Sequence, residues 1–132
     1  MIAFVDTSAF LAVLDGDDRH HAQARRRWKE LIEGQSALVC TAYVLVETIA
    51  LLQSRLGTEA VRVFHEDIAP LLSIEWVDEE LHRGGMTALL TASRRNLSLV
   101  DCVSFEVMRR RGITTAFAFD RHFREQGLGD VI

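Results

Sequence analysis

Short apolar runs alternate along this chain with longer segments of helical periodicity, and this alternation constrains the fold more than any other feature. Strands are predicted over residues 2–5, 37–40, 73–77 and 114–119, with a short fifth over 129–132. Helices are predicted over 19–33, 41–54, 58–70, 78–95 and 98–111. Strands that alternate with helices of this length form a mostly parallel sheet covered on both faces. We therefore expect an α/β fold with four to five strands.

Several predicted helix ends carry the residues that usually stand there. Gly34 and Gly112 follow two of the helical segments, and glycine is the commonest residue just beyond a helix. Ser98 and Asp101 have the spacing of a capping box, in which each side chain accepts a hydrogen bond from the other residue's amide. Pro70 ends the segment before the third strand, because proline cannot continue a helix.

Composition limits the chain to a compact folded unit. Of its 132 residues, 48% are hydrophobic, 26% are charged and one is proline, which excludes disordered and low-complexity proteins. We expect one domain over residues 1–132, a length typical of a single domain. Two cysteines, Cys40 and Cys102, are too few for a disulfide framework, so we expect a cytoplasmic protein.

No signal peptide or membrane span is expected. The first six residues lack basic side chains and reach Asp6 after four apolar residues, unlike a secretory signal. Residues 35–54 are as long as a membrane span, but they include Thr41, Tyr43 and Glu47 and fit a buried strand that leads into a helix.

Four acidic residues stand in sequence that is otherwise suited to burial. Asp6 follows Ile-Ala-Phe-Val, Asp101 follows Leu-Ser-Leu-Val, and Asp120 follows Ala-Phe-Ala-Phe. Glu47 lies within the apolar stretch from Tyr43 to Leu52. An unpaired buried carboxylate costs several kcal/mol, so something must compensate these four. The other acids lie in helix first turns or polar runs, where solvent compensates them.

The predicted fold gives these acids a common place. Asp6 and Asp120 each follow a predicted strand, and open α/β sheets bind their ligands at the carboxyl ends of the strands. Glu47 and Asp101 can join them from neighbouring helices. Four carboxylates in one crevice would repel each other unless a cation were bound, and ligation by oxygen alone selects Mg²⁺ or Mn²⁺.

Purely structural interpretations stay open for three of the four acids. Asp6 can cap a turn through residues 7 and 8, Asp101 can be the third residue of a capping box, and Asp120 can cap residues 121–126. Glu47 has no such alternative, because it lies in the middle of a predicted helix.

Other hydrolytic and nucleotide-binding chemistries lack the residues they need. The chain has neither a phosphate-binding loop nor a dinucleotide fingerprint, and its histidines do not have the spacing of a zinc hydrolase. A dehalogenase-like phosphatase would need an aspartate two residues after Asp6, where Ser8 stands. A receiver-type domain would need a lysine after a late strand, and Lys29 is the only lysine.

The motifs around these acids resemble those of the PIN-domain ribonucleases, specifically the VapC type of toxin–antitoxin systems. The similar segments are Val5-Asp6-Thr7-Ser8, Val46-Glu47, 97–105 around Asp101, and Ala118-Phe119-Asp120-Arg121-His122-Phe123. The resemblance covers essentially the whole chain, and the acidic quartet of the family maps onto Asp6, Glu47, Asp101 and Asp120 with none missing. Ser8 matches the small hydroxyl residue that often follows the first aspartate.

The resemblance implies a three-layer α/β/α fold and an endoribonuclease that depends on Mg²⁺ or Mn²⁺. It also implies a homodimer and a small antitoxin protein that blocks the site. Asp6, Asp101 and Asp120 would hold one or two cations, with Glu47 either as a further ligand or as the group that orients the attacking water. One alternative is a catalytically silent PIN-like domain that binds RNA or protein. A structure-specific DNA nuclease is disfavoured by the short chain.

Arg121 and Arg124 are the first candidates for contacts with the RNA backbone, because they directly follow a candidate ligand. The run 109–111 lies at a predicted helix end, where basic residues are favoured for structural reasons. Although the chain has a formal charge of −4, it would have 15 acidic and 15 basic residues without the four candidate ligands. Net charge therefore does not exclude a polyanionic substrate.

Overall fold

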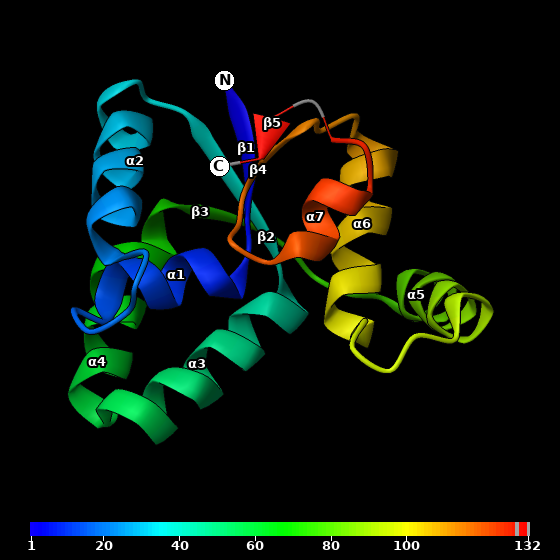
Figure 1. Ribbon diagram of the computed structural model, residues 1–132, viewed down its shortest axis with the longest axis horizontal. Helices are drawn as coiled ribbons and strands as arrows, with labels where there is room; N and C mark the ends of the chain where they lie inside the picture. Colours follow the sequence, from blue (N-terminus) through cyan, green and yellow to red (C-terminus); the bar gives the residue numbers. More distant parts are fainter. Residues whose placement is uncertain (129, 132) are drawn as a thin grey trace.

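A parallel β-sheet forms the centre of the protein (Figure 1). The structure, a computed structural model, describes residues 1–128 and 130–131. Within these residues the strand order is β3-β2-β1-β4-β5, and each neighbouring pair is parallel. The strands are β1 (Ile2–Val5), β2 (Ala37–Thr41), β3 (Leu72–Glu75), β4 (Thr115–Phe117) and β5 (Asp130–Val131). The predicted α/β class and parallel sheet are confirmed.

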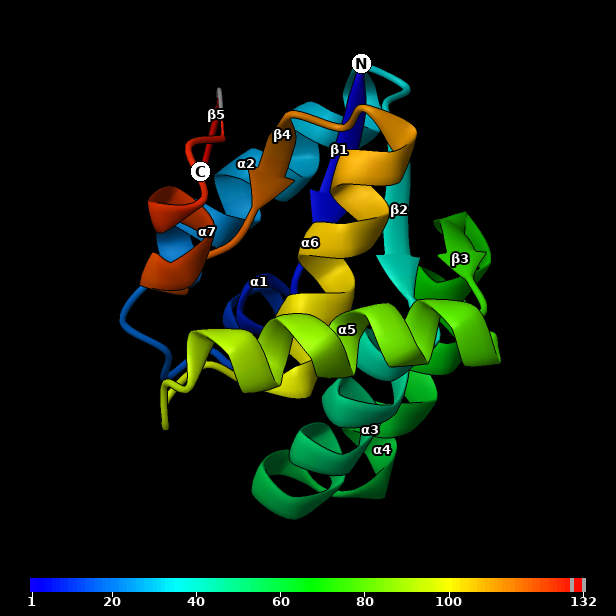
Figure 2. The same cartoon turned by 90° about the vertical axis from the view of Figure 1, so that its right-hand side faces the viewer.

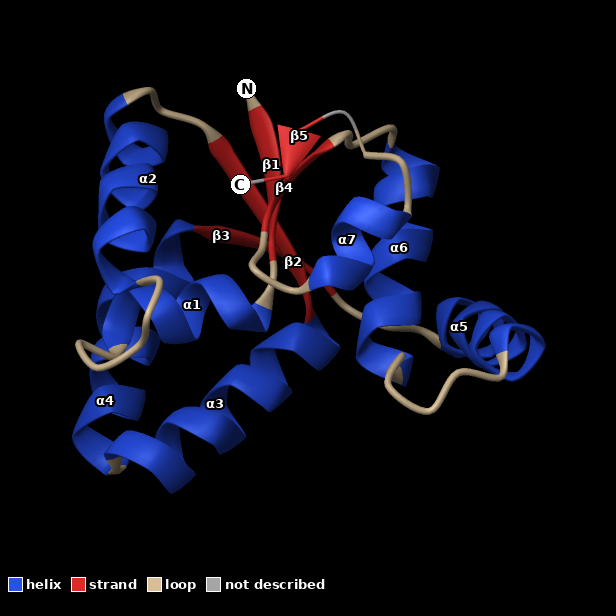
Figure 3. Ribbon diagram, viewed as in Figure 1, coloured by secondary structure: helices blue, strands red, loops and turns tan. Residues whose placement is uncertain are grey.

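Helices cover both faces of the sheet (Figures 2 and 3). One side carries α1 (Thr7–Leu14), α2 (His21–Glu33) and α4 (Thr58–Val63), which runs into the π-helix η1 (Phe64–Ile68) and the 3₁₀-helix η2 (Ala69–Leu71). The other side carries α5 (Glu79–Ala92), α6 (Leu99–Arg111) and α7 (Arg121–Glu125). The helix α3 (Ala42–Leu56) runs beneath the carboxyl ends of the strands. These layers form the expected α/β/α arrangement.

The predicted boundaries need several corrections. No helix was predicted over residues 7–14, because Ala9 to Val13 are all buried and a helix that is apolar all round lacks amphipathic periodicity. The segment 58–70 is not one helix but the succession α4, η1 and η2. The third strand lies at 72–75 and the fourth at 115–117, both shorter than predicted. For the fifth strand, the predicted positions 129 and 132 lie outside the described residues.

Aromatic residues fill the core between the sheet and its helices. The largest fully buried side chains include five phenylalanines: Phe4, Phe10, Phe64, Phe117 and Phe123. Phe4 of β1 stacks on Phe123 of α7 with ring centroids 6.2 Å apart, and Phe10 of α1 meets Phe64 edge to face at 5.2 Å. Ala3, Phe4 and Val5 of β1 are fully buried between β2 and β4, so this strand is held at the centre of the molecule. Its carboxyl end is therefore a fixed point from which a site can be built.

Both cysteines are free and buried, and burial raises the pKa of the Cys40 thiol to about 12. Burial also raises the pKa of Cys102, so neither residue has the low-pKa thiol of a reactive cysteine. Among the described residues, no helix combines the length and the apolar character needed to span a membrane.

The close packing of α5 on α6 gives a first prediction. A Cβ atom added to Gly85 would lie 2.5 Å from Cγ2 of Val103 and 3.3 Å from Cδ1 of Leu99. We expect Gly85→Ala to lower the free energy of unfolding by about 1–3 kcal/mol, because the two helices must move apart. The control is Gly84→Ala, whose Cβ would meet Arg110 at an ordinary 3.7 Å. In urea unfolding this control should be neutral or stabilising by up to about 1 kcal/mol, and equal losses in the two variants would contradict the packing argument.

Candidate active site

Two of the predicted acids lie side by side at the carboxyl edge of the sheet. Asp6 directly follows β1, and the turn that contains Asp120 follows β4, the neighbour of β1. The amide of Asp6 donates to the carbonyl oxygen of Phe117 at 3.1 Å, which extends the pairing of the two strands to this point. The chain geometry therefore places the two carboxylates in one region.

Glu47 and Asp101 join this region from α3 and α6. Burial is the largest cause of the raised pKa values of Glu47 and Asp6, and the nearby charges of Asp101 and Asp120 raise both values further. Asp6 and Asp101 are buried, whereas Glu47 and Asp120 are half-buried. The structure thus brings all four predicted acids together, from four different elements or turns. We call Asp6, Glu47, Asp101 and Asp120 the acidic cluster.

Asp6 is the most perturbed member of the cluster. The residue is only 4% exposed, and burial raises its pKa from 3.8 to about 7. The hydroxyl and the amide of Ser8 donate to Oδ2 of Asp6 at 2.6 and 3.2 Å, and these hydrogen bonds lower the pKa in part. Neighbouring carboxylates raise it further, so an ionised Asp6 is costly in the metal-free protein.

Burial is also the main cause that raises the pKa values of Glu47 and Asp101. A hydrogen bond with Thr7 acts in the opposite direction on Glu47, as do hydrogen bonds with Ser98 and the nearby His122 on Asp101. Three of the four acids therefore favour the protonated state relative to an exposed carboxyl group. Perturbation of several titratable groups in one place is typical of a functional site.

The structural interpretations of the three aspartates also hold. Asp6 caps α1 by accepting from the amide of Ser8, and Asp120 caps α7 by accepting from the amide of His122 at 2.9 Å. Asp101 and Ser98 form the predicted capping box of α6, with both hydrogen bonds present. Capping and membership of the cluster are compatible. Because helix N-termini carry partial positive charge, three of them converging here also offset part of the repulsion.

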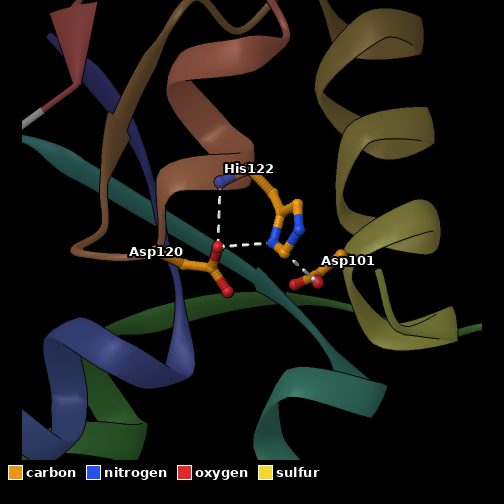
Figure 4. A group of neighbouring side chains, drawn as sticks. All are labelled: Asp101, Asp120 and His122. Carbon is orange, nitrogen blue, oxygen red and sulfur yellow. Dashed lines mark hydrogen bonds and ion pairs between the residues drawn. The ribbon is translucent and has the colours of Figure 1, made fainter. Parts of the chain in front are cut away.

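His122 is a member of the site that the sequence did not predict. Its Nδ1 lies 2.6 Å from Oδ1 of Asp120 and 3.8 Å from Oδ2 of Asp101 (Figure 4). Its Nε2 is buried and has no hydrogen-bond partner among the described residues. Because Nδ1 faces a carboxylate oxygen, which only accepts when it is ionised, we assign the ring proton to Nδ1. The only signal was the spacing of the motif, in which a histidine two residues after a capping aspartate can reach back to it.

The hydrogen bond from His122 predicts a positioning role. His122→Leu should weaken Mn²⁺ binding about 10- to 100-fold, because Asp120 loses the donor that orients it. His122→Asn should retain most of the affinity, since its amide nitrogen can take a place close to that of Nδ1. Isothermal titration calorimetry measures both variants. Equal affinities of the leucine variant and the unmodified protein would show that the hydrogen bond has no such role.

The donor atoms of the cluster fit a hard divalent cation. Carboxylate oxygens of Asp101 and Asp120 lie within 4.8 Å of each other and of a ring nitrogen of His122. The carboxylates of Asp6 and Glu47 lie near enough for the charges of Asp101 and Asp120 to raise their pKa values. Closely spaced carboxylates with raised pKa values indicate a cation-binding site, since a cation would favour their ionised forms. Oxygen-rich sites of this kind suit Mg²⁺ and Mn²⁺ better than Zn²⁺.

The remaining predicted site residues fall into two groups. Ser8 points its hydroxyl at Asp6 and accepts a hydrogen bond from the amide of Phe119 at 2.9 Å, so it ties the two strand ends together. Arg121 and Arg124 are both exposed on α7, directly after Asp120. Either guanidinium is therefore free to reach a bound polyanion beside the cluster.

The basic run 109–111 lies in the last turn of α6, as the structural interpretation predicted. Arg109 and Arg110 both form ion pairs with Glu106 on the same helix. Arg94, which follows α5, forms an ion pair with Glu125 of α7 at 2.8 Å. These pairings leave the arginines of α7 as the stronger candidates for contacts with a polyanion.

Comparison with known proteins agrees with this geometry. The PIN domain profile matches residues 3–127. The chain is 35% identical over 130 residues to the 23S rRNA-specific endonuclease VapC20 of Mycobacterium tuberculosis, over 97% of this chain and 96% of the relative. The crystal structure of that VapC20, described as a sarcin–ricin loop cleaving toxin, has a TM-score of 0.85 at 32% identity, over 97% and 96% of the two chains.

A second solved structure shares the fold only. FitAcB from Neisseria gonorrhoeae gives a TM-score of 0.69 at 15% identity, over 100% of this chain and 97% of that one. The profile match covers nearly the whole chain, and the sequence match to VapC20 is of similar extent. The protein therefore belongs to the PIN-domain family, in its VapC-type branch.

Proposed function

We propose that this protein is a metal-dependent endoribonuclease and the toxin of a type II toxin–antitoxin module. The convergence of Asp6, Glu47, Asp101 and Asp120 at the carboxyl edge of the sheet, seen in the effects of their charges on one another, carries the proposal. The similarity to VapC20, named as an endonuclease specific for 23S rRNA, supports RNA as the substrate. We propose a structured ribosomal RNA as the substrate class.

The proposed mechanism assigns a role to each acid. Asp6, Asp101 and Asp120 would hold Mg²⁺ or Mn²⁺, which when bound supplies the positive charge that activates water and stabilises the transition state. Glu47, half-buried on α3, would accept a proton from the attacking water or complete the ligand set. Ser8 keeps Asp6 in place, and His122 keeps Asp120 in place. The side chains of the cluster thus act as ligands and proton acceptors.

No residue of the cluster acts as a covalent nucleophile in this mechanism. Water attacks the phosphorus and the 3′-oxygen leaves, so the products carry a 5′-phosphate and a 3′-hydroxyl. A 2′,3′-cyclic phosphate among the products would show that the ribose hydroxyl attacks instead, and would contradict this mechanism.

The proposed partners are a second copy of the chain and a small antitoxin. Large apolar side chains are exposed at several places, including Val46 at 65%, Trp76 at 69% and Leu90 at 71%. Exposed apolar groups of this size are typical of surfaces that proteins cover. A homodimer in the cytoplasm, inhibited by an antitoxin, would account for such surfaces.

The test of the proposed function is digestion of total cellular RNA by purified protein. We expect discrete cleavage in Mn²⁺ or Mg²⁺ and none in excess EDTA. The matched protein control is Asp101→Asn, which retains an acceptor for the capping box but removes a charged ligand. RNA binding without cleavage in any divalent metal would favour the alternative of a catalytically silent PIN-like domain.

The exposed arginine next to Asp120 gives a further prediction. Arg121→Ala should weaken RNA binding several-fold and lower the slope of log affinity against log salt by about one, because one phosphate contact is lost. Arg62→Ala is the matched control, since Arg62 lies on α4 and pairs with Glu59. Filter binding over a range of salt concentrations measures both. An unchanged slope for Arg121→Ala would exclude the contact.

A further inference from the structure

A stacked pair of aromatic rings lies beside the acidic cluster. The rings of His20 and Phe119 have centroids 4.4 Å apart and planes within 9° of parallel. His20 ends the loop between α1 and α2, and Phe119 immediately precedes Asp120. Phe119 also contacts the buried ring of Phe117 edge to face at 6.0 Å. The core therefore supports Phe119, and His20 is the outer ring of the pair.

The pair is fixed relative to the cluster by hydrogen bonds. The amide of Phe119 donates to the hydroxyl of Ser8, which itself donates to Asp6 at 2.6 Å. On the other side, the amide of His20 donates to Oδ1 of Asp18 at 2.8 Å. Main-chain contacts thus hold both rings, so that replacing the His20 side chain leaves the anchor of its loop intact.

The surroundings of the pair have the chemistry of nucleotide recognition. Both rings are half-buried, and because Phe119 covers one face of His20, the exposed area of His20 lies on its other face and its edges. Arg19 is exposed and donates from Nε to Nε2 of His20 at 3.1 Å, and Arg121 is exposed on α7. A flat ring next to guanidinium groups can bind a base and its phosphates together.

The loop that carries His20 also holds three acidic residues, Asp15, Asp17 and Asp18. Asp15 and Asp18 use carboxylate oxygens to accept the amides of Asp17 and His20, at 2.9 and 2.8 Å. Two of the three loop carboxylates are thus turned towards the loop's own backbone. Arg19 and Arg121 supply positive charge on the same side of the molecule.

We propose that His20, supported by Phe119, is a stacking site for one unpaired base of the RNA next to the scissile phosphate. This inference rests on the proposed function, because it takes RNA as the substrate. It adds a requirement on the conformation of the RNA. A base can stack on His20 only when it is not paired and stacked within an RNA helix. Cleavage should therefore occur in loops or unpaired segments.

The experiment compares two substitutions of His20, one that removes the planar ring and one that retains a planar ring. His20→Leu retains apolar packing on Phe119 but removes the planar face, whereas His20→Phe retains the face. The probe is a uridine dodecamer with 2-aminopurine at its centre, whose fluorescence falls when the base stacks. Binding is followed in Ca²⁺, and KM and kcat are measured in Mn²⁺ with the RNA cleaved in the total-RNA digestion.

We expect His20→Leu to weaken binding of the probe and raise KM by between about 5-fold and 100-fold, as for loss of one stacked base, with kcat unchanged within about twofold. The quenching of 2-aminopurine should be lost in this variant, and His20→Phe should restore both quenching and KM. Mn²⁺ affinity and the thermal midpoint should be the same in both variants.

Equal quenching in His20→Leu and the unmodified protein would overturn the inference, as would an equal loss in the two variants. Failure of the proposed function gives a different pattern. In that case the unmodified protein cleaves no RNA, while quenching that depends on His20 still supports the stacking site.

Discussion

Asp6→Asn is expected to abolish RNA cleavage and at the same time to raise the stability of the metal-free protein. The asparagine can still accept the amide hydrogen bond of Ser8 that caps α1, but it carries no charge to be buried. Near pH 8, an ionised Asp6 with a pKa of about 7 against an ordinary 3.8 costs about 4 kcal/mol. Removing that cost should raise the thermal midpoint by roughly 10–20 °C.

The matched control for this variant is Asp67→Asn, because Asp67 is exposed on η1, outside the cluster. It should leave both cleavage and the thermal midpoint unchanged within about 1 °C. Opposite effects on activity and stability are typical of residues retained for function at the expense of the fold. If Asp6→Asn lowered the midpoint, the aspartate would be mainly a structural cap, and the functional interpretation would lose its strongest support.

The second large effect is a loss of stability in the metal-free protein as pH rises. Asp6 in the folded protein retains its proton up to about pH 7, whereas the unfolded chain loses it near 3.8. The folded state therefore binds more protons over this window, and its stability falls as pH increases through it. The raised pKa values of Glu47 and Asp101 act with the same sign. Urea unfolding in EDTA at about pH 5 and about pH 8 measures the difference, which should be several kcal/mol.

Divalent metal should reverse this trend, because it binds the ionised cluster of the folded state. At a Mn²⁺ concentration one hundred times the dissociation constant, the expected gain is about 2.7 kcal/mol. In Asp6→Asn, the free energy of unfolding should depend less on pH, and it should increase less when Mn²⁺ is added. Stability that rises between pH 5 and 8 in EDTA, with no response to Mn²⁺, would contradict the account of the cluster.

The fold could be predicted from the sequence because its main signals are local. The strand at Ile2–Val5 is a continuous apolar run, and the helix at Leu99–Arg111 is marked by Ser98 at one end and Gly112 at the other. The helix α1 gave no such signal, since burial on nearly all sides removes the contrast between its faces. Its absence from the prediction did not change the fold class, because its neighbours already required a parallel sheet.

The candidate site was only partly predictable, because some of its residues carry a local sequence signal and others do not. A carboxylate in apolar sequence is conspicuous, so Asp6, Glu47, Asp101 and Asp120 could be selected from the chain alone. A histidine in the first turn of a helix can equally face solvent, so the role of His122 could not be identified until its ring was seen against Asp120. Contacts between distant segments, such as His20 with Phe119, have no sequence pattern at all.

The cluster also shows why capping and ligation need not be alternatives. In α7, Oδ1 of Asp120 accepts from both the amide and the ring of His122, whereas these two bonds do not use its other oxygen. In α1, both hydrogen bonds from Ser8 fall on Oδ2 of Asp6, and again the second oxygen is not used by them. A cap that occupies one oxygen therefore orients the other, which supports the assignment of these residues as ligands.

The most direct test of the account is a crystal structure of the protein soaked in Mn²⁺, with data collected at a wavelength where manganese scatters anomalously. The account predicts an anomalous peak within about 2.0–2.3 Å of carboxylate oxygens of Asp6, Asp101 and Asp120. Glu47 would lie either at the same distance or one water molecule away. A peak elsewhere, or none among the four carboxylates at a Mn²⁺ concentration that supports RNA cleavage, would contradict it.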